Sequence, residues 1–275
     1  MSSRTHAAAL LALVALALVA RPVAGQLERP VESPAVEGKD VVWVPTPDAA
    51  VERMLALARV GPQDLVVDLG SGDGRIPIIA AKRFGARGRG IEYSSDLVEV
   101  NRNNARDEGI ADRVRFERGD LFDADFRDAT VVTLYLLTSL NVKLRPKLLD
   151  LRPGTRVVSH VFRMGDWQPD EAAKIGASDL YLWRVPARVA GRWRVTVAGG
   201  DGFELALEQR YQRLAGRALA EGEARALRGA GLAGDKIRFA YTDARGVPRT
   251  FAGRVVGDRI DGAGGGWSAT RVRSN

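Results

Sequence analysis

Hydrophobic positions in the first two thirds of the chain follow two alternating patterns. In residues 48–60, Val51, Met54 and Leu55 recur at helical spacing, which predicts an amphipathic helix. Residues 65–67 are apolar at every position, as in strands that are buried on both faces of a parallel sheet. The same patterns predict helices over residues 75–84, 94–108 and 139–151, the last interrupted at Pro146, and strands over residues 88–93, 114–117, 129–137 and 155–162. This alternation predicts a doubly wound α/β sheet with right-handed crossovers, in which ligands bind at the carboxyl ends of the strands.

Beyond about residue 190 the pattern changes to short runs of alternating apolar and polar residues, separated by glycine-rich turns such as residues 199–202. The runs fall at residues 193–197, 203–209, 236–241 and 251–256. They predict a small antiparallel β-module, with a closing hairpin of a sandwich or barrel near residues 262–267. We therefore expect an α/β domain over residues 41–189 and a β-rich C-terminal domain over residues 190–275.

The N-terminus has the pattern of a secretory signal peptide. A positive charge at Arg4 precedes an apolar run over residues 7–20, and small residues lead up to Gly25. The run is shorter than the roughly 20 residues that span a bilayer, so no transmembrane span is expected after the leader is removed. We expect a signal peptide over residues 1–25, a polar linker over residues 26–40 and export to the periplasm or envelope. The protein would be cytoplasmic if the leader is not used.

Residues 66–75, with the sequence VVDLGSGDGR, form the strongest candidate for a ligand-binding loop. Gly70, Gly72 and Gly74 permit a positive φ and leave space for a ligand to approach the backbone. The predicted helix that follows presents free N–H groups that attract an anion. A glycine cluster alone is more often a plain loop. The strand, the acidic Asp68, the glycines and the helix together predict binding of a nucleotide-type cofactor.

A second acidic residue, Glu92, ends the next predicted strand. It falls about 20 residues beyond the glycine loop, where a doubly wound fold places the acid that binds ribose hydroxyls. Glu92 is therefore the expected partner of a ribose, with a solvated loop carboxylate as the alternative. The third glycine comes one residue earlier than in the GxGxxG pattern, so the loop differs from that of a dinucleotide site.

Residues 68–74 have the pattern DxGxGxG, which resembles motif I of class I S-adenosyl-L-methionine (SAM) methyltransferases. Residues 119–122 (GDLF) are similar to the adenine-contacting turn of that family. Together with residues 43–47 (WVPTP) and 133–137 (TLYLL), these motifs resemble the bacterial relatives of the small lysine methyltransferases that modify ATP-synthase and ADP/ATP-carrier proteins. The resemblance covers residues 41–185.

This resemblance implies a Rossmann-like class I methyltransferase fold, with S-adenosyl-L-methionine as the cofactor. It implies that the cofactor is bound by the following residues: Thr46, Asp68, Gly70, Ser71, Gly72, Gly74, Glu92, Asp120 and Leu121. Asp120 would accept a hydrogen bond from the adenine amino group. Thr46 would contact the cofactor from a prolyl loop that closes over it, although the prolines beside Thr46 could instead simply begin the helix.

The acceptor of the methyl group is less clearly marked. The asparagine-proline-proline-aromatic tetrad of enzymes that methylate planar amines is absent after the fourth strand, where residues 136–139 read LLTS. Methylation of a planar amine is therefore disfavoured. The resemblance implies a protein lysine amine as the acceptor, with a small molecule as the alternative, and catalysis by proximity and by desolvation of the amine. Tyr135 is the candidate to line the acceptor position, and an aromatic ring packed in the sheet is the alternative.

Other residues near this end of the sheet are weaker candidates. Asp166 and Trp167 follow the fifth strand and could hold a cation by charge and ring face, with a structural loop as the alternative. His160 falls in a predicted strand, where a histidine with satisfied hydrogen bonds is more common than a catalytic base. The chain has no cysteine and two histidines, so no metal site is expected.

Charge divides the chain where the hydrophobic pattern does. The net charge is +7; residues 190–275 hold 15 basic and nine acidic residues, whereas residues 26–189 hold 24 and 25. The basic β-module is a candidate to bind an anionic protein or envelope surface, with a solvated face of arginines as the alternative. Nucleic acid is not an expected partner, because no motif combines basic and aromatic residues.

Two hypotheses of function remain. The first is an active SAM-dependent methyltransferase that acts on a protein lysine. The second is an exported, non-catalytic binding protein that keeps a methyltransferase-like fold and uses its β-module to engage an anionic partner or surface. The motif acids favour the first hypothesis. The leader favours the second, because SAM is made and consumed in the cytoplasm.

Overall fold

A computed structural model of the chain describes residues 44–273. The expected signal peptide and linker lie outside the described residues, so the prediction of export stays a prediction. Within residues 44–273 no helix is long and apolar enough to cross a membrane.

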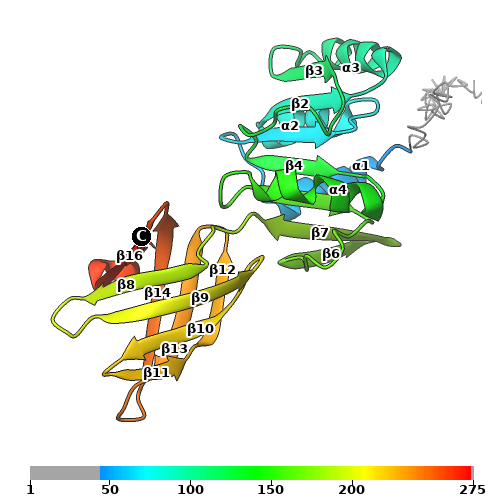
Figure 1. Ribbon diagram of the computed structural model, residues 1–275. Helices are drawn as coiled ribbons and strands as arrows, with labels where there is room; N and C mark the ends of the chain where they lie inside the picture. The colour runs from blue at the N-terminus through cyan, green and yellow to red at the C-terminus, as the bar shows by residue number, and fades with distance from the viewer. Residues whose placement is uncertain (1–43, 274–275) are drawn as a thin grey trace, which may run out of the picture. The chain divides into compact units, whose positions relative to one another are not determined.

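The first part of the described chain forms a seven-stranded sheet with the strand order β3-β2-β1-β4-β5-β7-β6 (Figure 1). Its strands are β1 (Leu65–Leu69), β2 (Arg87–Glu92), β3 (Val114–Arg118), β4 (Val131–Leu134), β5 (Arg156–His160), β6 (Glu171–Ile175) and β7 (Ser178–Arg184). Its helices are α1 (Asp48–Leu57), α2 (Arg75–Phe84), α3 (Ser95–Asp107) and α4 (Thr138–Leu149). Strands β1 to β5 are parallel, and β7 runs antiparallel between β5 and β6. The prediction of a doubly wound class I methyltransferase sheet is confirmed.

Apolar side chains bury both faces of this sheet. One face carries Val66, Val131 and Val158, which pack with residues of α1 and α2. The adjacent residue of each strand points to the opposite face and packs against Leu144 and Leu148 of α4. Because helices cover both faces, backbone groups are open to a ligand only where the strands end.

Three details differ from the predicted elements. Helix α4 continues past Pro146, because proline removes only one backbone N–H and buried Leu144 and Leu148 hold the helix on either side. Strand β4 ends at Leu134, so Tyr135 lies just beyond it. The β6–β7 hairpin was not predicted, because β6, with the sequence EAAKI, shows no alternation of apolar and polar residues.

The C-terminal part forms a nine-stranded antiparallel sheet, closed into a barrel-like ring because β9 also pairs with β10. Its strands are β8 (Gly191–Val197), β9 (Phe203–Arg210), β10 (Arg213–Ala220), β11 (Glu223–Ala226), β12 (Arg228–Ala233), β13 (Lys236–Thr242), β14 (Pro248–Val256), β15 (Arg259–Gly262) and β16 (Trp267–Arg271). Inward-facing aromatic residues such as Trp193, Phe203 and Phe239 fill its core. The prediction of an antiparallel β-module is thus confirmed.

Strands β10, β11 and β12 were not predicted, because glycine, alanine and arginine interrupt their alternation of apolar and polar residues. Gly216 shows why β10 needs a glycine. Its φ is +155°, and a Cβ there would lie 2.0 Å from the carbonyl oxygen of Ala206 on β9. The close approach of β9 and β10 that closes the ring therefore depends on the missing side chain.

Candidate cofactor and acceptor site

The glycine loop joins β1 to α2 at the carboxyl end of the sheet. Gly70, Gly72 and Gly74 have φ values of +79°, +56° and +81°, a region that residues with side chains rarely adopt. Gly74 also immediately precedes α2, and a Cβ there would lie 2.8 Å from the ring of Phe116. The backbone N–H groups of Gly70 and Ser71 donate to the Ile91 carbonyl at 2.9 and 3.1 Å, which fixes the loop across the end of β2.

Glu92 lies against this loop at the end of β2. Its carboxylate accepts hydrogen bonds from the backbone N–H of Gly72 at 2.9 Å and from that of Ser94 at 3.0 Å. Each carboxylate oxygen has a second lone pair that can accept a hydroxyl donor. The sequence-predicted ribose acid is therefore held beside the glycine loop and retains acceptor capacity.

Asp68 is buried at the end of β1, with 3% of its surface exposed. The Thr133 hydroxyl of β4 donates to its Oδ1 at 2.6 Å. Burial raises the pKa of the Asp68 carboxyl to about 8, and the nearby carboxylates of Glu92 and Asp73 contribute in the same direction. Near neutral pH this group therefore carries a proton, and a bound cation would favour its ionisation.

Ser71 is also buried, and its hydroxyl accepts from the Asn101 side chain of α3 at 3.1 Å. Asn104, one turn further along α3, donates to the carbonyl of Asp73 at 2.9 Å. In this structure Ser71 therefore faces the protein and helps to fix the loop. The two asparagines were not predicted, because their partners are about 30 residues away in sequence.

Thr46 lies in the prolyl segment before α1 and is 4% exposed. Its carbonyl oxygen accepts from the guanidinium of Arg75 at 3.1 Å, and the same guanidinium donates from Nε to Asp73 at 3.0 Å. Arg75 thereby joins the prolyl segment to the glycine loop. Sequence reasoning missed this role, although Arg75 directly follows the third glycine.

Asp120 and Leu121 follow β3. Asp120 is half-buried, and its Oδ1 accepts from the Phe122 backbone N–H at 2.9 Å. A surface hollow at the ends of β2 and β3 is lined by Ile91, Gly119 and Asp120, among other residues. Leu121 packs beside the sheet core. The structure thus brings the predicted adenine-contacting acid to the same edge as Glu92.

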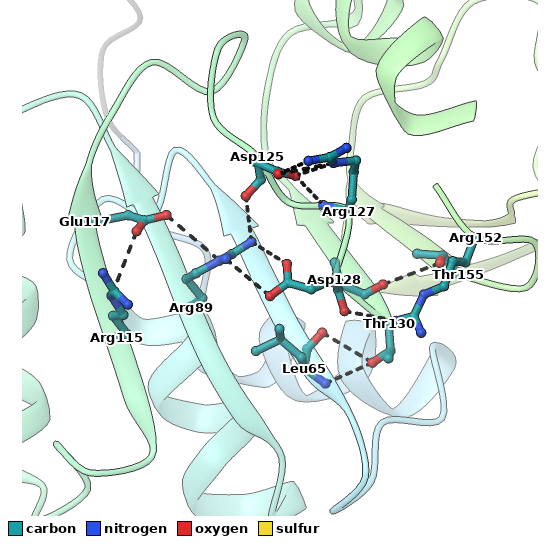
Figure 2. Close-up of polar contacts among 11 residues, drawn as sticks. Leu65, Arg89, Arg115, Glu117, Asp125, Arg127, Asp128, Thr130, Arg152 and Thr155 are labelled. Atoms are coloured by element: carbon teal, nitrogen blue, oxygen red, sulfur yellow. Dashed lines mark hydrogen bonds and ion pairs between the residues drawn. The ribbon is translucent and has the colours of Figure 1, made fainter. Parts of the chain in front are cut away.

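The segment that follows Asp120 is anchored to the sheet by Arg89 of β2 (Figure 2). The guanidinium donates to the carbonyl of Asp125 at 3.0 Å and to the carboxylate of Asp128 at 2.8 Å. Thr130 then joins this segment to β1, because its hydroxyl accepts from the backbone N–H of Leu65 at 2.9 Å. These contacts fix a connection between β3 and β4 that has no helix.

On the acceptor side, Tyr135 lies partly buried after β4. Its ring packs against His160, at the end of β5, with 4.3 Å between ring centroids, and against Phe162 at 6.0 Å. The side chain of the next residue, Leu136, lies 3.4 Å from the position of a Cβ on Gly70. The predicted acceptor residue is therefore next to the glycine loop and in an aromatic cluster.

Asp166 and Trp167 are engaged within the protein. Asp166 accepts from Arg210 at 2.8 Å and from the Tyr211 hydroxyl at 3.0 Å, and it also pairs with Arg145; these contacts hold the pKa of Asp166 well below its usual range. Trp167 has no exposed surface, and its ring stacks on Tyr211. Their contacts support the interpretation as a structural loop.

Known proteins resemble this chain in the region of the site. The family model of the ANTKMT methyltransferase domain matches residues 68–171. A protein-lysine N-methyltransferase of Saccharolobus islandicus is 44% identical over 137 residues, which are 49% of this chain and 85% of the relative. The chain belongs to this methyltransferase family. An adenine nucleotide translocase lysine N-methyltransferase of Mus musculus is 37% identical over 143 residues, 51% of this chain and 61% of the relative.

A solved structure described as an RNA methyltransferase from Salinibacter ruber, in complex with S-adenosyl-L-homocysteine, is 55% identical, with a TM-score of 0.52. The match covers 53% of the methyltransferase described here and 96% of the Salinibacter chain. These comparisons confirm that the protein is a SAM-dependent methyltransferase. They give no support to the alternative of a non-catalytic binding protein.

The residues at the site of this methyltransferase fit its cofactor. Gly70, Gly72 and Gly74 carry no side chain that would block approach to the loop backbone, and the start of α2 attracts a carboxylate. Asp68 and Glu92 supply acceptors for an ammonium group and for hydroxyls. When bound, SAM supplies an electrophilic methyl group on sulfur.

Proposed function

We propose that the protein transfers the methyl group of SAM to a lysine amine of another protein. The observation that carries this proposal is an apolar rim at the carboxyl edge of the seven-stranded sheet. Val44, Tyr93, Leu137 and Val161 are 54%, 40%, 46% and 37% exposed. Tyr93, Leu137 and Val161 follow strands β2, β4 and β5, and Val44 belongs to the prolyl segment that Arg75 joins to the glycine loop.

An exposed apolar rim suits the side chains of a protein better than a phosphate backbone. Sites that bind nucleic acid present cations to the phosphates, whereas the rim is made of aliphatic and aromatic groups. The aromatic ring of Tyr135 continues this surface inwards and can line the aliphatic stem of a lysine. The relatives named as lysine methyltransferases support the same acceptor class.

The proposed roles of the cofactor-binding residues follow from their places in the structure. Gly70, Gly72 and Gly74 provide close backbone approach, and the start of α2 faces the carboxylate. Asp68 accepts from the ammonium group, and Glu92 accepts from the ribose hydroxyls. Asp120 accepts from the adenine amino group beside Leu121, while Thr46 and Ser71 help to shape the loops around the cofactor.

Catalysis requires little chemistry from the protein beyond placing the amine. An amine is nucleophilic only when it has lost its extra proton, and burial beside apolar groups lowers the pKa of a lysine ammonium. Tyr135 and the apolar rim supply such surroundings. Alignment of the amine with the methyl group then accounts for the rate enhancement.

RNA is the second candidate acceptor, because the Salinibacter neighbour is described as an RNA methyltransferase. The methyltransferase described here lacks the tetrad that grips planar amines, which argues against a base amino group. Its rim is apolar, which also argues against RNA as the acceptor.

Transfer of tritium from labelled SAM into a cell lysate distinguishes the two acceptors. Residues 26–275 of the protein are incubated with lysate and labelled SAM. One portion of the product is then treated with protease and another with ribonuclease. We expect label that protease releases and ribonuclease does not, and mass spectrometry should place it on lysine. Label released by ribonuclease alone would overturn the lysine proposal.

A variant of Glu92, which lies against the glycine loop, tests the cofactor assignment. Glu92→Ala should abolish SAM binding in calorimetry, since two loop N–H groups and the ribose lose their acceptor. Asp112→Ala is the matched control, because Asp112 is an exposed carboxylate in the turn before β3. Equal affinity of both variants for SAM would contradict the assignment.

We also propose that the basic β-module binds an anionic partner. Five exposed cations on β10, β12 and β13 have no ion pair with another residue of the described range 44–273: Arg213, Arg217, Arg228, Lys236 and Arg238. Several other arginines of the module are paired, as in Arg192 with Glu204 and Arg271 with Asp258. This concentration of unpaired charge favours an anionic protein or envelope surface.

The proposal of export rests on the leader pattern alone. N-terminal sequencing of the protein from fractionated cells tests it. A chain that begins after Gly25 in the periplasm or envelope would support export, and a chain that begins at Met1 in the cytosol would exclude it.

A further inference from the structure

His160 is a buried polar side chain that the steps proposed above do not use. It ends β5 with 2% of its surface exposed, and neither ring nitrogen has a hydrogen-bond partner among the described residues. Buried polar atoms without a partner are rare, because their lost hydration is not replaced. The sequence favoured a histidine with satisfied hydrogen bonds, and the structure shows the opposite.

The backbone next to His160 is strained. Val161 has a φ of +64°, which is rare for a β-branched residue, and the Phe162 N–H donates to the His160 carbonyl across it at 2.7 Å. The Ser159 hydroxyl holds the turn through the Phe162 carbonyl at 2.7 Å. Such strain persists where the surroundings impose it, and it is concentrated at functional sites.

Strand register places His160 two strands away from the cofactor loop, at the same end of the sheet. Asp68 of β1 is opposite Thr133 of β4, and Thr133 is opposite Val158 of β5. Two residues further along each chain are Gly70, Tyr135 and His160, on the same face of the sheet as Asp68 because side chains alternate. The imidazole is therefore on the acceptor side, separated from the glycine loop by the Tyr135 segment.

Tyr135 is the residue that could expose this imidazole. Its ring packs against His160, it is only partly buried, and its hydroxyl has no hydrogen bond to another described residue. It also lies beyond the end of β4, where no ladder hydrogen bond fixes its backbone. A rotation of this ring would open the imidazole towards the apolar rim.

Resting on the proposed function, we propose that His160 accepts an N–H hydrogen bond from the neutral lysine amine and directs the amine lone pair at the methyl group. In the transfer, the amine nitrogen gains a bond to the methyl carbon, the carbon–sulfur bond breaks, and its electron pair stays on sulfur. The products are a methylammonium, whose N–H remains bonded to His160, and S-adenosyl-L-homocysteine. The lysine ammonium loses one proton to solvent, and so becomes neutral, before the amine is buried.

The charge state of His160 agrees with this role. Burial lowers the pKa of the imidazole below its usual range, so the ring is neutral at pH 7. A neutral imidazole has one nitrogen that accepts a hydrogen bond, whereas an imidazolium has none.

The test compares His160→Phe, His160→Asn and Phe162→Leu in the full chain. His160→Phe keeps an aromatic ring against Tyr135 but has no acceptor, whereas His160→Asn restores an acceptor in less volume. Phe162→Leu is the control, because it alters the same cluster and leaves the imidazole. Transfer from tritiated SAM into total cell protein, SAM affinity by calorimetry and the melting temperature are measured for each.

We expect His160→Phe to lose at least tenfold in rate at saturating SAM, with SAM affinity changed less than twofold and the melting temperature unchanged or raised. His160→Asn should recover part of the rate, and Phe162→Leu should stay within threefold of the wild type. A His160→Phe rate within twofold of the wild type would overturn the role of His160 alone. If His160→Phe does not fold, His160→Leu takes its place, because leucine also has no acceptor. A His160→Leu rate at least tenfold below that of Phe162→Leu supports the proposal, and a rate within twofold of it overturns the role of His160. Wild-type protein that labels RNA and no protein would instead overturn the proposed function, and this inference with it.

Discussion

Burial of Asp68 makes a measurable contribution to how stability depends on pH. The pKa of its carboxyl is raised from 3.8 to about 8 in the folded chain, so the folded state holds more protons than the unfolded state between these values. The free energy of unfolding therefore falls by about 1.4 kcal/mol for each pH unit in this window. Asp68→Asn removes the titrating group while keeping its shape and one acceptor oxygen for Thr133.

The stability of Asp68→Asn relative to the wild type should therefore rise by about 4 kcal/mol between pH 5 and pH 8, and should level off above pH 8. Urea denaturation of both chains without cofactor, at unit steps of pH, measures this difference. Other titrating groups cancel in the comparison because both chains share them. Asp112→Asn, at an exposed acid, should give a constant difference. A constant difference for Asp68→Asn would refute the burial of a protonated carboxyl.

Four further predictions concern binding and the loops. The ammonium group of SAM should favour ionisation of the Asp68 carboxyl, so SAM binding at pH 7 should release about 0.9 proton per SAM from this group. Calorimetry in buffers of different ionisation enthalpy measures this release, and no release would contradict the assignment. Gly74→Ala should weaken SAM binding at least tenfold in calorimetry and lower the free energy of unfolding by about 3 kcal/mol, because backbone strain and the Phe116 ring both oppose the Cβ. Gly109→Ala is the control, because φ is +67° there and the space is open; it should lose only about 1 kcal/mol and bind SAM normally. Arg75→Met should raise the Kd for SAM about tenfold by releasing the prolyl segment, a step of about 1.4 kcal/mol, and an unchanged Kd would exclude that link. Replacement of the five cations on β10, β12 and β13 by glutamate should abolish salt-sensitive binding to anionic vesicles or acidic protein in sedimentation, while SAM affinity stays constant.

The sequence predicted where the glycine loop and Glu92 lie, because local chemistry determines their positions. Positive φ at Gly70, Gly72 and Gly74 requires glycine, and α2 has the predicted bounds because a glycine stands at each end. Glu92 could be placed because the distance from one strand end to the next is nearly constant in this fold. These assignments of contact to the cofactor remain predictions, although the residues lie together as expected.

The remaining features depend on partners that are distant in sequence. Arg75 and Asn101 act through contacts with residues 29 and 30 positions away, which no local pattern encodes. The exposure and hydrogen bonding of His160 depend on how Tyr135 packs, so the sequence favoured the commoner kind of strand histidine. Strands β10 to β12 were missed because glycine, alanine and arginine interrupt their hydrophobic alternation, and Gly216 is required by the close approach of β9.

The pairing of β9 with β10 also limits how the β-module can associate with other chains. Strand edges with unpaired backbone groups recruit foreign strands and promote aggregation. In the seven-stranded sheet those edges are β3 and β6. In the C-terminal sheet, ring closure pairs β9 on both sides and leaves the four-residue β11, which pairs with β10 alone, as an edge. The C-terminal module is therefore suited to reversible contacts through side chains, and fusions or truncations that open the ring between Arg210 and Arg213 would turn it into an aggregation-prone sheet.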